Sequence, residues 1–312
     1  MKIVVTGSGG FIGGRLVGSL CEVGHTVTCT DKIGMSGARG KTPVFELDVT
    51  IGEGLLRAFE GADGVVHLAA RNHVLKETEE DPLSAYRRVN VEGTRNVVRA
   101  AVRAGARWVI HFSSVKAMGE GGDAVFDERS PCRPATPYGI SKLESEGVVR
   151  QEAEGSGIRA VIFRLPMAYG PGNLGNLPRM IRWADRGLPF PLFHPDNLRS
   201  MIYVGNVVHA VLLAIREAPL GVSTYILKDV EDYSTRKLYT AICRELGKPP
   251  RFLPVPAWMA RLGGVLSEDM RKVIGSFRVS SGKIRKELGY SPPFSLEQGI
   301  AETVEWYRRS AR

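Results

Sequence analysis

The chain has few of the features that mark membrane, secreted or metal-binding proteins. No apolar run in its 312 residues approaches the roughly 18 residues needed to span a bilayer. Its four cysteines form no CxxC pair, and its six histidines form no HExxH motif. The first residues, MKIVVTGSGG, pass from a short apolar run straight into glycines, where a signal peptide would remain apolar. We therefore expect a cytoplasmic protein with reduced thiols, no bound metal and no membrane partner.

The positive charge of the chain is not gathered into one segment. Lysine and arginine number 42 against 33 aspartates and glutamates, which gives a formal net charge of +9. Acidic residues interleave with the basic ones along the whole chain, so we expect no nucleic-acid partner. A surface of this kind favours small polyanionic ligands instead.

Short β-branched runs alternate with longer helical patterns over the first two thirds of the chain. Such alternation indicates βαβ units and a parallel sheet with helices on both faces. The predicted strands are Lys2–Thr6, Thr26–Asp31, Val44–Leu47, Val65–Leu68, Trp108–Ser113 and Ala160–Leu165. The predicted helices are Ile12–Glu22, Glu53–Phe59, Pro82–Ala104 and Pro137–Glu154. The sequence therefore predicts an α/β fold with a doubly wound parallel sheet.

The composition changes after Pro166. The stretches MAYGPGNLGNLP and GLPFPLFHPDNL are rich in glycine, proline and asparagine, which is typical of loops that line a site. Further elements are predicted at Thr224–Leu227 (a strand) and at Asn206–Glu217, Ser234–Leu246 and Leu296–Arg309 (helices). We predict a first domain over residues 1–166 and a smaller α/β C-terminal domain over 167–312, with some segments crossing back to the sheet.

A glycine-rich loop, TGSGGFIG, joins the first predicted strand to the first predicted helix. Its Gly7, Gly10 and Gly13 allow a tight turn and let backbone N–H groups at a helix N-terminus approach a pyrophosphate. Asp31 ends the second predicted strand, where a carboxylate can accept both hydroxyls of an adenosine ribose. Together these features indicate a dinucleotide-binding site in the first domain.

Asp31 also bears on which dinucleotide is bound. Its carboxylate would repel a 2′-phosphate, which favours NAD over NADP. Arg15 and Lys32 lie nearby in sequence and could counter this repulsion, so the preference stays open. Asp48 could accept the adenine amino group or be an ordinary loop aspartate, and the sequence leaves both open.

Tyr138 and Lys142 lie four residues apart in PYGISK, which places both side chains on one helix face. A tyrosine can act as a general base only if its pKa falls from about 10 toward 7, and a nearby ammonium favours that change. The preceding predicted strand ends in Ser113 and Ser114, which puts hydroxyl groups close to this pair. The alternative is a tyrosine packed on a helix beside a surface lysine.

At this point the chain resembles the extended short-chain dehydrogenases/reductases, within them the nucleotide-sugar epimerase/dehydratase group that includes UDP-glucose 4-epimerases. The segments TGSGGFIG, HLAA, NVEGTRNV, FSS, YGISK and RLPMAYGPG occur in the family's order, and the C-terminal ELGYSPPFSLEQGIAETVEWYR is similar too. The resemblance covers nearly the whole chain. It implies a Rossmann-type sheet, an NAD cofactor and a nucleotide-sugar substrate.

The resemblance also implies roles for individual residues. Tyr138 would be the base, Lys142 would hold the nicotinamide ribose and lower the Tyr138 pKa, and Ser114 would bond the substrate oxygen. Asn90 would support the helix that carries the first two. The implied cofactor residues are Gly7, Gly10, Phe11, Ile12, Gly13, Asp31, Lys32, Asp48, Val49, Leu68, Ala69, Ala70, Asn90, Ser113, Tyr138, Lys142 and Leu165. The implied substrate residues are Ser114, Asn176, Arg199, Arg271 and Phe277.

Within this group the residues after Ser114 narrow the reaction. Family members that form 4-keto-6-deoxy sugars carry an Asp-Glu pair there, whereas this chain has Val115 and Lys116, which argues against 4,6-dehydration. A UDP-hexose 4-epimerase, working by transient oxidation at C4 and return of the hydride, is favoured. An NAD(P)H-dependent 4-keto-sugar reductase or dehydrogenase is the alternative. A non-catalytic dinucleotide sensor is a third reading, which the presence of both Tyr138 and Lys142 disfavours.

The string SSVKAMGE looks closest to a subgroup of bacterial surface-polysaccharide enzymes that contains both kinds of reaction. A bulky Phe277 would favour a sugar with a plain C2 hydroxyl over an N-acetyl group. Family members form homodimers through two long helices, for which Pro82–Ala104 and Pro137–Glu154 are the candidates. In the first helix Val89, Val97, Val98 and Ala101 would face the sheet and leave a second apolar patch over.

Overall fold

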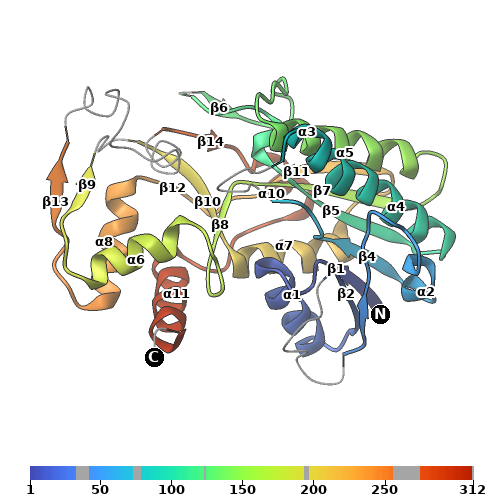
Figure 1. Ribbon diagram of the computed structural model, residues 1–312, viewed down its shortest axis with the longest axis horizontal. Helices are drawn as coiled ribbons and strands as arrows, with labels where there is room; N and C mark the ends of the chain where they lie inside the picture. Colours follow the sequence, from blue (N-terminus) through green and yellow to red (C-terminus); the bar gives the residue numbers. More distant parts are fainter. Residues whose placement is uncertain (33–41, 73–78, 123, 193–196, 256–274, 311–312) are drawn as a thin grey trace.

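The computed structural model describes residues 1–32, 42–72, 79–122, 124–192, 197–255 and 275–310 (Figure 1). A seven-stranded sheet forms its centre, and every strand in it pairs in parallel, as predicted. The strand order is β11-β7-β5-β4-β1-β2-β3, in which the chain runs outward in both directions from β1 and β4. The strands are β1 (Lys2–Thr6), β2 (Thr26–Asp31), β3 (Val44–Glu46), β4 (Gly64–His67), β5 (Trp108–Ser114), β7 (Arg159–Leu165) and β11 (Val222–Ile226).

Helices cover both faces of this sheet, as the alternating pattern predicts. Successive residues of β1 point to opposite faces, so Ile3 and Val5 join one buried cluster and Val4 joins the other. The first cluster includes side chains of α1 (Phe11–Glu22), α7 (Val204–Glu217) and α10 (Gly282–Leu288). The second includes side chains of α2 (Leu55–Phe59), α4 (Gly93–Arg103) and α5 (Pro137–Ala153).

The long helix predicted over Pro82–Ala104 is not continuous. It consists of α3 (Pro82–Arg87), a π-helical turn over Arg88–Glu92 and α4. The turn contains the buried Asn90, whose side chain bonds both backbone groups of Arg71. A single extra residue per turn of this kind often marks a functional position in a helix. The hydrophobic periodicity on which the prediction rested continues across the turn and does not reveal it.

The C-terminal part contains its own core, at the left of Figure 1. Helices α6 (Asn176–Asp185), α8 (Thr235–Leu246) and α11 (Leu296–Ser310) contact one another there. Beside them lie two small sheets, made of β8 (Met167–Tyr169), β10 (Arg199–Tyr203) and β12 (Asp232–Tyr233), and of β9 (Phe190–Leu192) and β13 (Phe252–Pro254). A further pair joins β6 (Val125–Phe126) to β14 (Arg278–Val279).

Two stretches predicted as loops therefore contain regular structure. MAYGPGNLGNLP includes β8 and the first turn of α6, and GLPFPLFHPDNL includes β9. These strands are only three residues long and are held by partners distant in sequence, such as Met201 opposite Met167. Local periodicity cannot reveal pairing of that kind.

Some segments after residue 166 lie with the central sheet. Strand β11 pairs with β7 at the sheet edge, and α7 packs against α1. The side chain of Glu302 on α11 accepts a hydrogen bond from Tyr203 and pairs with Arg15 of α1 at 3.3 Å. These contacts join the C-terminal helices to the helix that follows the glycine loop, whereas the domain boundary at residue 166 stays a prediction.

Candidate active site

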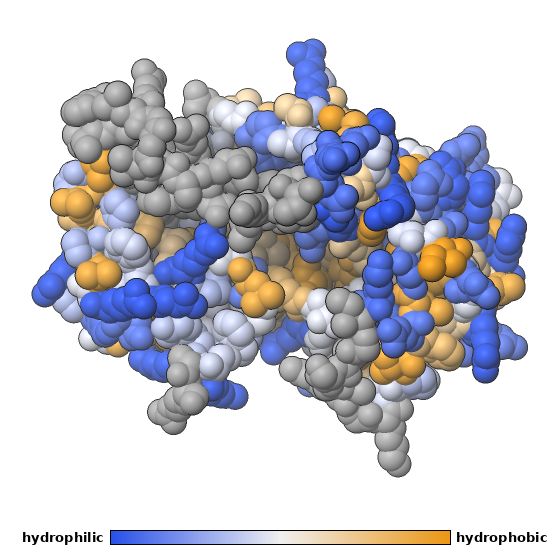
Figure 2. Space-filling model, in the orientation of Figure 1, coloured by the Kyte–Doolittle hydropathy of each residue, from blue (hydrophilic) through white to orange (hydrophobic). Residues whose placement is uncertain are grey.

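A cavity of about 270 Å³ lies at the carboxyl ends of the central strands. Parallel α/β sheets bind their ligands at this edge, where the strand order reverses. Figure 2 shows a hollow near the middle of the molecule, with apolar residues on its floor. The residues that line the cavity are Gly7, Gly10, Phe11, Ile12, Gly13, Leu68, Ala70, Asn72, Phe112, Ser113, Ser114, Tyr138, Lys142, Leu165, Pro166, Ala168 and Asn173. Most of the predicted cofactor residues and all three predicted catalytic residues are thus brought together.

The glycine loop allows a very close backbone approach on one side of the cavity. Gly7 has a positive φ of 67°, and a Cβ atom there would lie 2.6 Å from the Ala69 nitrogen. A Cβ atom on Gly13 would lie 2.3 Å from the Gly7 carbonyl oxygen. Helix α1 starts directly after this turn, and its N-cap residue is Gly10, which has no side chain to occupy the helix terminus. The loop and the helix N-terminus therefore suit a pyrophosphate group.

Asp31 lies at the end of β2 and turns its carboxylate toward the glycine loop. Its Oδ2 atom accepts a hydrogen bond from the Gly9 N–H group at 2.9 Å. Its neighbour Lys32 places Nζ 2.9 Å from Oδ2 of Asp48. This ion pair occupies the lysine that could have bound a 2′-phosphate, so the geometry favours a dinucleotide with a free 2′-hydroxyl.

Asp48 has partners within its own turn. Burial opposes its ionisation, but hydrogen bonds from Lys32 and Thr50 outweigh burial and lower the pKa of Asp48 to about 2. Thr50 supplies both its N–H group (2.8 Å) and its hydroxyl (2.7 Å). The adjacent Val49 is buried and packs against Gly93 of α4. These contacts give both residues a structural role, and an additional contact to adenine stays a prediction.

The predicted catalytic residues lie where β5 ends and α5 begins. The Thr136 side chain caps α5 by accepting from the Gly139 N–H group at 3.2 Å, and Tyr138 and Lys142 follow one turn apart. The Lys142 ammonium donates to the Phe112 carbonyl oxygen at 2.7 Å. Ser114 is hydrogen-bonded to Tyr138 through its side chain. The hydroxyl, the phenol and the ammonium therefore surround one end of the cavity.

Two tight contacts hold α5 in this place. A Cβ atom on Gly139 would lie 2.4 Å from the Lys116 carbonyl oxygen, so glycine lets the helix start directly beside the turn that follows β5. Asn90 donates a hydrogen bond to the Ser141 hydroxyl at 3.0 Å from the π-helical turn. Asn90 thus supports the helix that carries Tyr138 and Lys142, and it lies behind the cavity wall.

Burial has the largest effect on the pKa values of Tyr138 and Lys142. Burial raises the pKa of Tyr138 to about 12, although the hydrogen bond with Ser114 opposes the rise. It lowers the pKa of Lys142 to about 8, although the nearby Glu146 opposes the fall. The expected lowering of the Tyr138 pKa by Lys142 is therefore absent from this structure, in which the ammonium is bound to the Phe112 carbonyl group.

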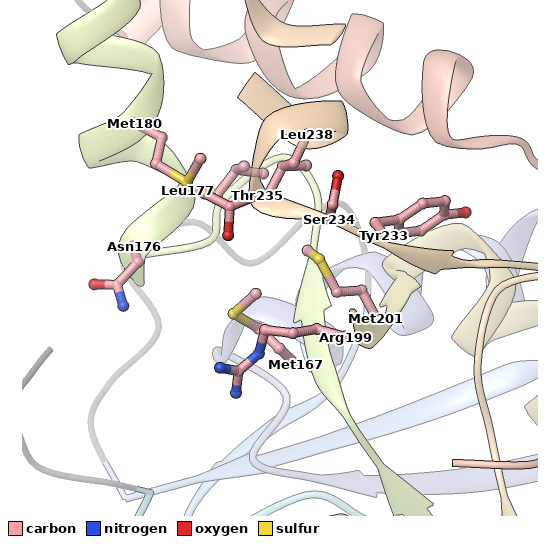
Figure 3. Close-up of a pocket in the computed structure, with 10 residues that line it drawn as sticks. All are labelled: Met167, Asn176, Leu177, Met180, Arg199, Met201, Tyr233, Ser234, Thr235 and Leu238. Atoms are coloured by element: carbon pink, nitrogen blue, oxygen red, sulfur yellow. The ribbon is translucent and has the colours of Figure 1, made fainter. Parts of the chain in front are cut away.

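A second, much smaller cavity of about 20 Å³ lies between the C-terminal elements (Figure 3). It brings together Asn176 and Arg199, two of the predicted substrate residues, from α6 and β10. The rest of its lining is mainly apolar and comprises Met167, Leu177, Met180, Met201, Tyr233, Ser234, Thr235 and Leu238. In Figure 3 the Arg199 guanidinium lies beside Met167. Arg199 also donates to the Gly275 carbonyl oxygen at 2.9 Å, and burial lowers its pKa.

Phe277, another predicted substrate residue, lines neither of these two cavities. Phe277 is 5% exposed and packs against Phe126, with the Lys116 ammonium 5.5 Å from its ring centre. Arg271 lies outside the described residues.

Several cavity residues were not predicted from the sequence. Asn173 lines the larger cavity, and its side chain accepts from the Gly175 N–H group at 2.7 Å. The GPGN stretch that contains it is predicted to belong to a loop that lines a site, but no individual residue of GPGN is predicted to do so. Glu146, which does not line the cavity, was not predicted either: it is buried one turn after Lys142, and the repeated spacing of four from Tyr138 could have revealed it.

Comparison with known proteins identifies the family. Residues 3–226 match the family described as "NAD dependent epimerase/dehydratase family". The chain belongs to this family. It is 31% identical to a UDP-glucose 4-epimerase of Vibrio cholerae, over 97% of this chain and 94% of that protein. It is 27% identical to a dTDP-glucose 4,6-dehydratase of Neisseria meningitidis serogroup B, over 98% of this chain and 93% of that protein.

A solved structure agrees with this assignment. MoeE5 in complex with UDP-glucuronic acid and NAD superposes with a TM-score of 0.82 at 27% identity, over 99% of this chain and 100% of that one. The protein is therefore an NAD-dependent enzyme of the extended short-chain dehydrogenase/reductase type. Its larger cavity fits NAD, because the glycine loop and the N-terminus of α1 suit the pyrophosphate.

The described residues show two further features. None of the helices in this part of the chain is long and apolar enough to cross a membrane. No group of three or more histidine, cysteine, aspartate or glutamate side chains within the same residues is arranged to hold a metal ion.

Proposed function

We propose that the protein is a nucleotide-sugar 4-epimerase that acts on a UDP-hexose. The observation that carries this proposal is the composition of the turn after Ser114. Val115 is buried there, and Lys116 pairs with Glu120 at 2.6 Å, so neither position supplies the carboxylates that a 4,6-dehydration requires. The full set of Ser114, Tyr138 and Lys142 beside the NAD cavity supports chemistry at a sugar hydroxyl.

In this proposal Tyr138 moves the proton of the reacting hydroxyl. Its phenol oxygen accepts the proton in one direction and returns it in the other, as a general base and then a general acid. NAD, when bound, supplies a reversible hydride acceptor at the adjoining end of the cavity. Ser114 orients the substrate oxygen beside Tyr138, to which its hydroxyl is already hydrogen-bonded.

Lys142 gives this proton transfer its electrostatic support. Burial raises the Tyr138 pKa to about 12, so ionisation of the phenol near neutral pH needs positive charge close by. The Lys142 ammonium, one helical turn away and bonded here to the Phe112 carbonyl group, would supply that charge and would hold the ribose of NAD when NAD is bound. Arg199 and Asn176 are proposed to bind the nucleotide diphosphate and the sugar nucleotide near the smaller cavity.

Cofactor requirement tests the reaction type. An epimerase regenerates its NAD within each cycle, so NAD should co-purify and be released when the protein is denatured. UDP-glucose and UDP-galactose, or their C6-oxidised relatives, should interconvert without added cofactor and without a lasting change in absorbance near about 340 nm. Stoichiometric consumption of NAD(P)H with a 4-keto sugar, without interconversion of the 4-hydroxy pair, would instead establish the reductase.

The homodimer stays part of the proposal. Val97, Val98 and Ala101 are fully buried within one chain, so they form the inward face of α4. The outer surfaces of α4 and α5 carry ion pairs from Glu152 to Arg95 and Arg99. This polar surface does not show the second apolar patch that the sequence suggested. A sedimentation mass near 34.1 kDa at micromolar concentration would contradict the dimer. The cytoplasmic location also stays a prediction.

A further inference from the structure

Glu146 is a buried carboxylate one turn after Lys142 on α5. Its side chain is almost completely excluded from solvent, with 1% of the residue exposed. Arg164 of β7 donates to both of its oxygens, from Nε at 2.8 Å and from Nη2 at 2.7 Å. The Ser113 hydroxyl of β5 donates to Oε1 at 2.7 Å. One carboxylate thus connects the catalytic helix to two neighbouring strands of the central sheet.

These two strands carry the residues of the cavity wall. Ser113 lines the cavity and directly precedes Ser114. Arg164 directly precedes Leu165, which also lines the cavity and whose carbonyl oxygen accepts from the Ser114 hydroxyl at 3.4 Å. Any movement of Glu146 would therefore be transmitted to both sides of the site in which Tyr138 and Lys142 act.

Among the ionisable groups around Lys142, Glu146 is the one that favours its charged form. Tyr138 shares its helix face. His111 of β5 and His67 of β4 are both buried, and their ring centres lie 5.4 Å apart. Burial lowers the pKa of both imidazoles, to about 3 for His67. Both rings are therefore neutral at physiological pH. Two cations pair with Glu146, Arg164 at 2.7 Å and Arg150 of α5 at 3.5 Å. Within this set Glu146 supplies the negative charge.

A buried ion pair such as Glu146–Arg164 adds little to the free energy of unfolding. Removing two charges from water costs about as much as their attraction returns, and well-packed apolar residues often replace such pairs without loss. Here the carboxylate of the pair also bonds the cavity-lining Ser113 and lies one helical turn from Lys142. The pair can therefore position the groups of the site as well as contribute to stability.

We propose that Glu146 is a positioning residue of the proposed reaction, which fixes α5 against the ends of β5 and β7 and provides the negative charge that faces Lys142. The effect on catalysis rests on the proposed function, in which Lys142 takes part. The effect on the ionisation of Lys142 does not depend on that function. Because Glu146 favours the ammonium form, it keeps Lys142 charged at higher pH than burial would allow.

The test follows the ionisation of Lys142 by NMR of the purified protein labelled with ¹³C at lysine Cε, with Lys142→Ala identifying the signal. Glu146→Gln keeps an oxygen to accept from Arg164 and Ser113 but removes the charge. The Lys142 titration midpoint should fall by roughly one pH unit in this variant. Arg164→Gln should move the midpoint in the opposite direction, because Glu146 then keeps only the more distant Arg150, at 3.5 Å, as a cationic partner.

A matched control separates this effect from a general one. Glu152→Gln makes the same chemical change on the same helix, at a carboxylate that pairs with Arg95 and Arg99 near the surface, and it should leave the midpoint unchanged. A midpoint in folded Glu146→Gln equal to that of the unmodified protein would overturn the proposal. If that variant does not fold, an unchanged or lowered midpoint in Arg164→Gln would overturn it.

Turnover provides the functional readout. The loss of activity at alkaline pH should shift with the Lys142 midpoint in both variants, whereas a merely structural defect would lower activity equally at all pH values. The NMR titration does not depend on any substrate. A shifted midpoint without turnover of any UDP-sugar would therefore contradict the proposed function and leave the role of Glu146 established.

Discussion

The two cavities differ in the part of the chain that shapes them. The larger one is shaped by backbone, because a side-chain carbon on Gly7 or Gly13 would collide with main-chain atoms. The smaller one is shaped by side chains, among them Met167, Met180 and Met201. A site defined by backbone binds one constant group closely, whereas methionine side chains adapt to different partners. The first cavity is therefore suited to an invariant cofactor, and the residues of the second are proposed to adapt to the substrate.

The two cavities also differ in the residues they contain: the first contains the proposed catalytic residues, and the second contains residues proposed to select the substrate. Ser114, Tyr138 and Lys142 lie at the first cavity, on elements fixed by the central sheet. Arg199 and Asn176 lie at the second, on short strands and helices of the C-terminal part. Changes at the first cavity should abolish turnover or cofactor binding, and changes at the second should alter substrate affinity while the cofactor stays bound.

The largest effect is expected for Tyr138→Phe. Removing the phenol oxygen should lower turnover by a factor of about 10²–10⁴, the usual loss for a positioned acid–base group. NAD should still bind, since the glycine loop and Asp31 are untouched. Steady-state kinetics and the NAD released on denaturation measure the two effects. Retained turnover would remove Tyr138 from its proposed role and break the division between the two cavities.

The next effect is expected for the glycine loop. A methyl group on Gly13 would lie 2.3 Å from the Gly7 carbonyl oxygen, so Gly13→Ala should force the loop to shift. We expect NAD affinity to fall about a hundredfold, in line with the cost of overpacking. Gly14→Ala is the matched control, because its added carbon would meet nothing closer than 3.8 Å. Calorimetric titration with NAD distinguishes the variants, and equal affinities would show that side chains rather than backbone define this cavity.

The difference between the cavities also explains what the sequence could predict. Local sequence patterns were enough to predict three features of the site. These are the glycine loop, Asp31 and the Tyr138–Lys142 pair, each of which lies within a short segment. The parallel sheet was predictable for the same reason, since short β-branched strands alternate with helical patterns and runs such as VVHLAA and WVIHFSS are nearly continuously apolar. The family motifs extended these predictions to the cofactor.

What could not be predicted depends on contacts between distant segments. The smaller cavity combines residues from β8, α6, β10 and α8, and no local pattern indicates that Met167 lies opposite Met201. In the π-helical turn Asn90 bonds Arg71 and Ser141, which are distant in sequence. The high pKa of Tyr138 follows mainly from burial, which spacing along the helix does not fix.

A smaller effect is expected at the second cavity. Arg199→Ala removes a guanidinium proposed to bind the substrate diphosphate, so KM for a UDP-sugar should rise about tenfold to thirtyfold, the cost of losing a charged hydrogen bond. NAD content should not change. Arg182→Ala provides the control, because Arg182 lies on the exposed side of α6 in the same part of the molecule. If Arg199→Ala released NAD while KM stayed constant, the assignment of the two cavities would be wrong.

The smallest effect is expected for Asp31→Ala, and it concerns which dinucleotide the first cavity prefers. The variant loses the carboxylate that faces the ribose and opposes a 2′-phosphate, so the preference for NAD over NADP should fall about tenfold. The Lys32–Asp48 pair limits the change, because a lysine held at 2.9 Å from Asp48 is not free to bind the added phosphate. Asp31→Ala combined with Asp48→Asn should release Lys32 and lower the preference further. Competition titrations with NAD and NADP measure both steps, and a preference for NADP in the unmodified protein would contradict the role assigned to Asp31.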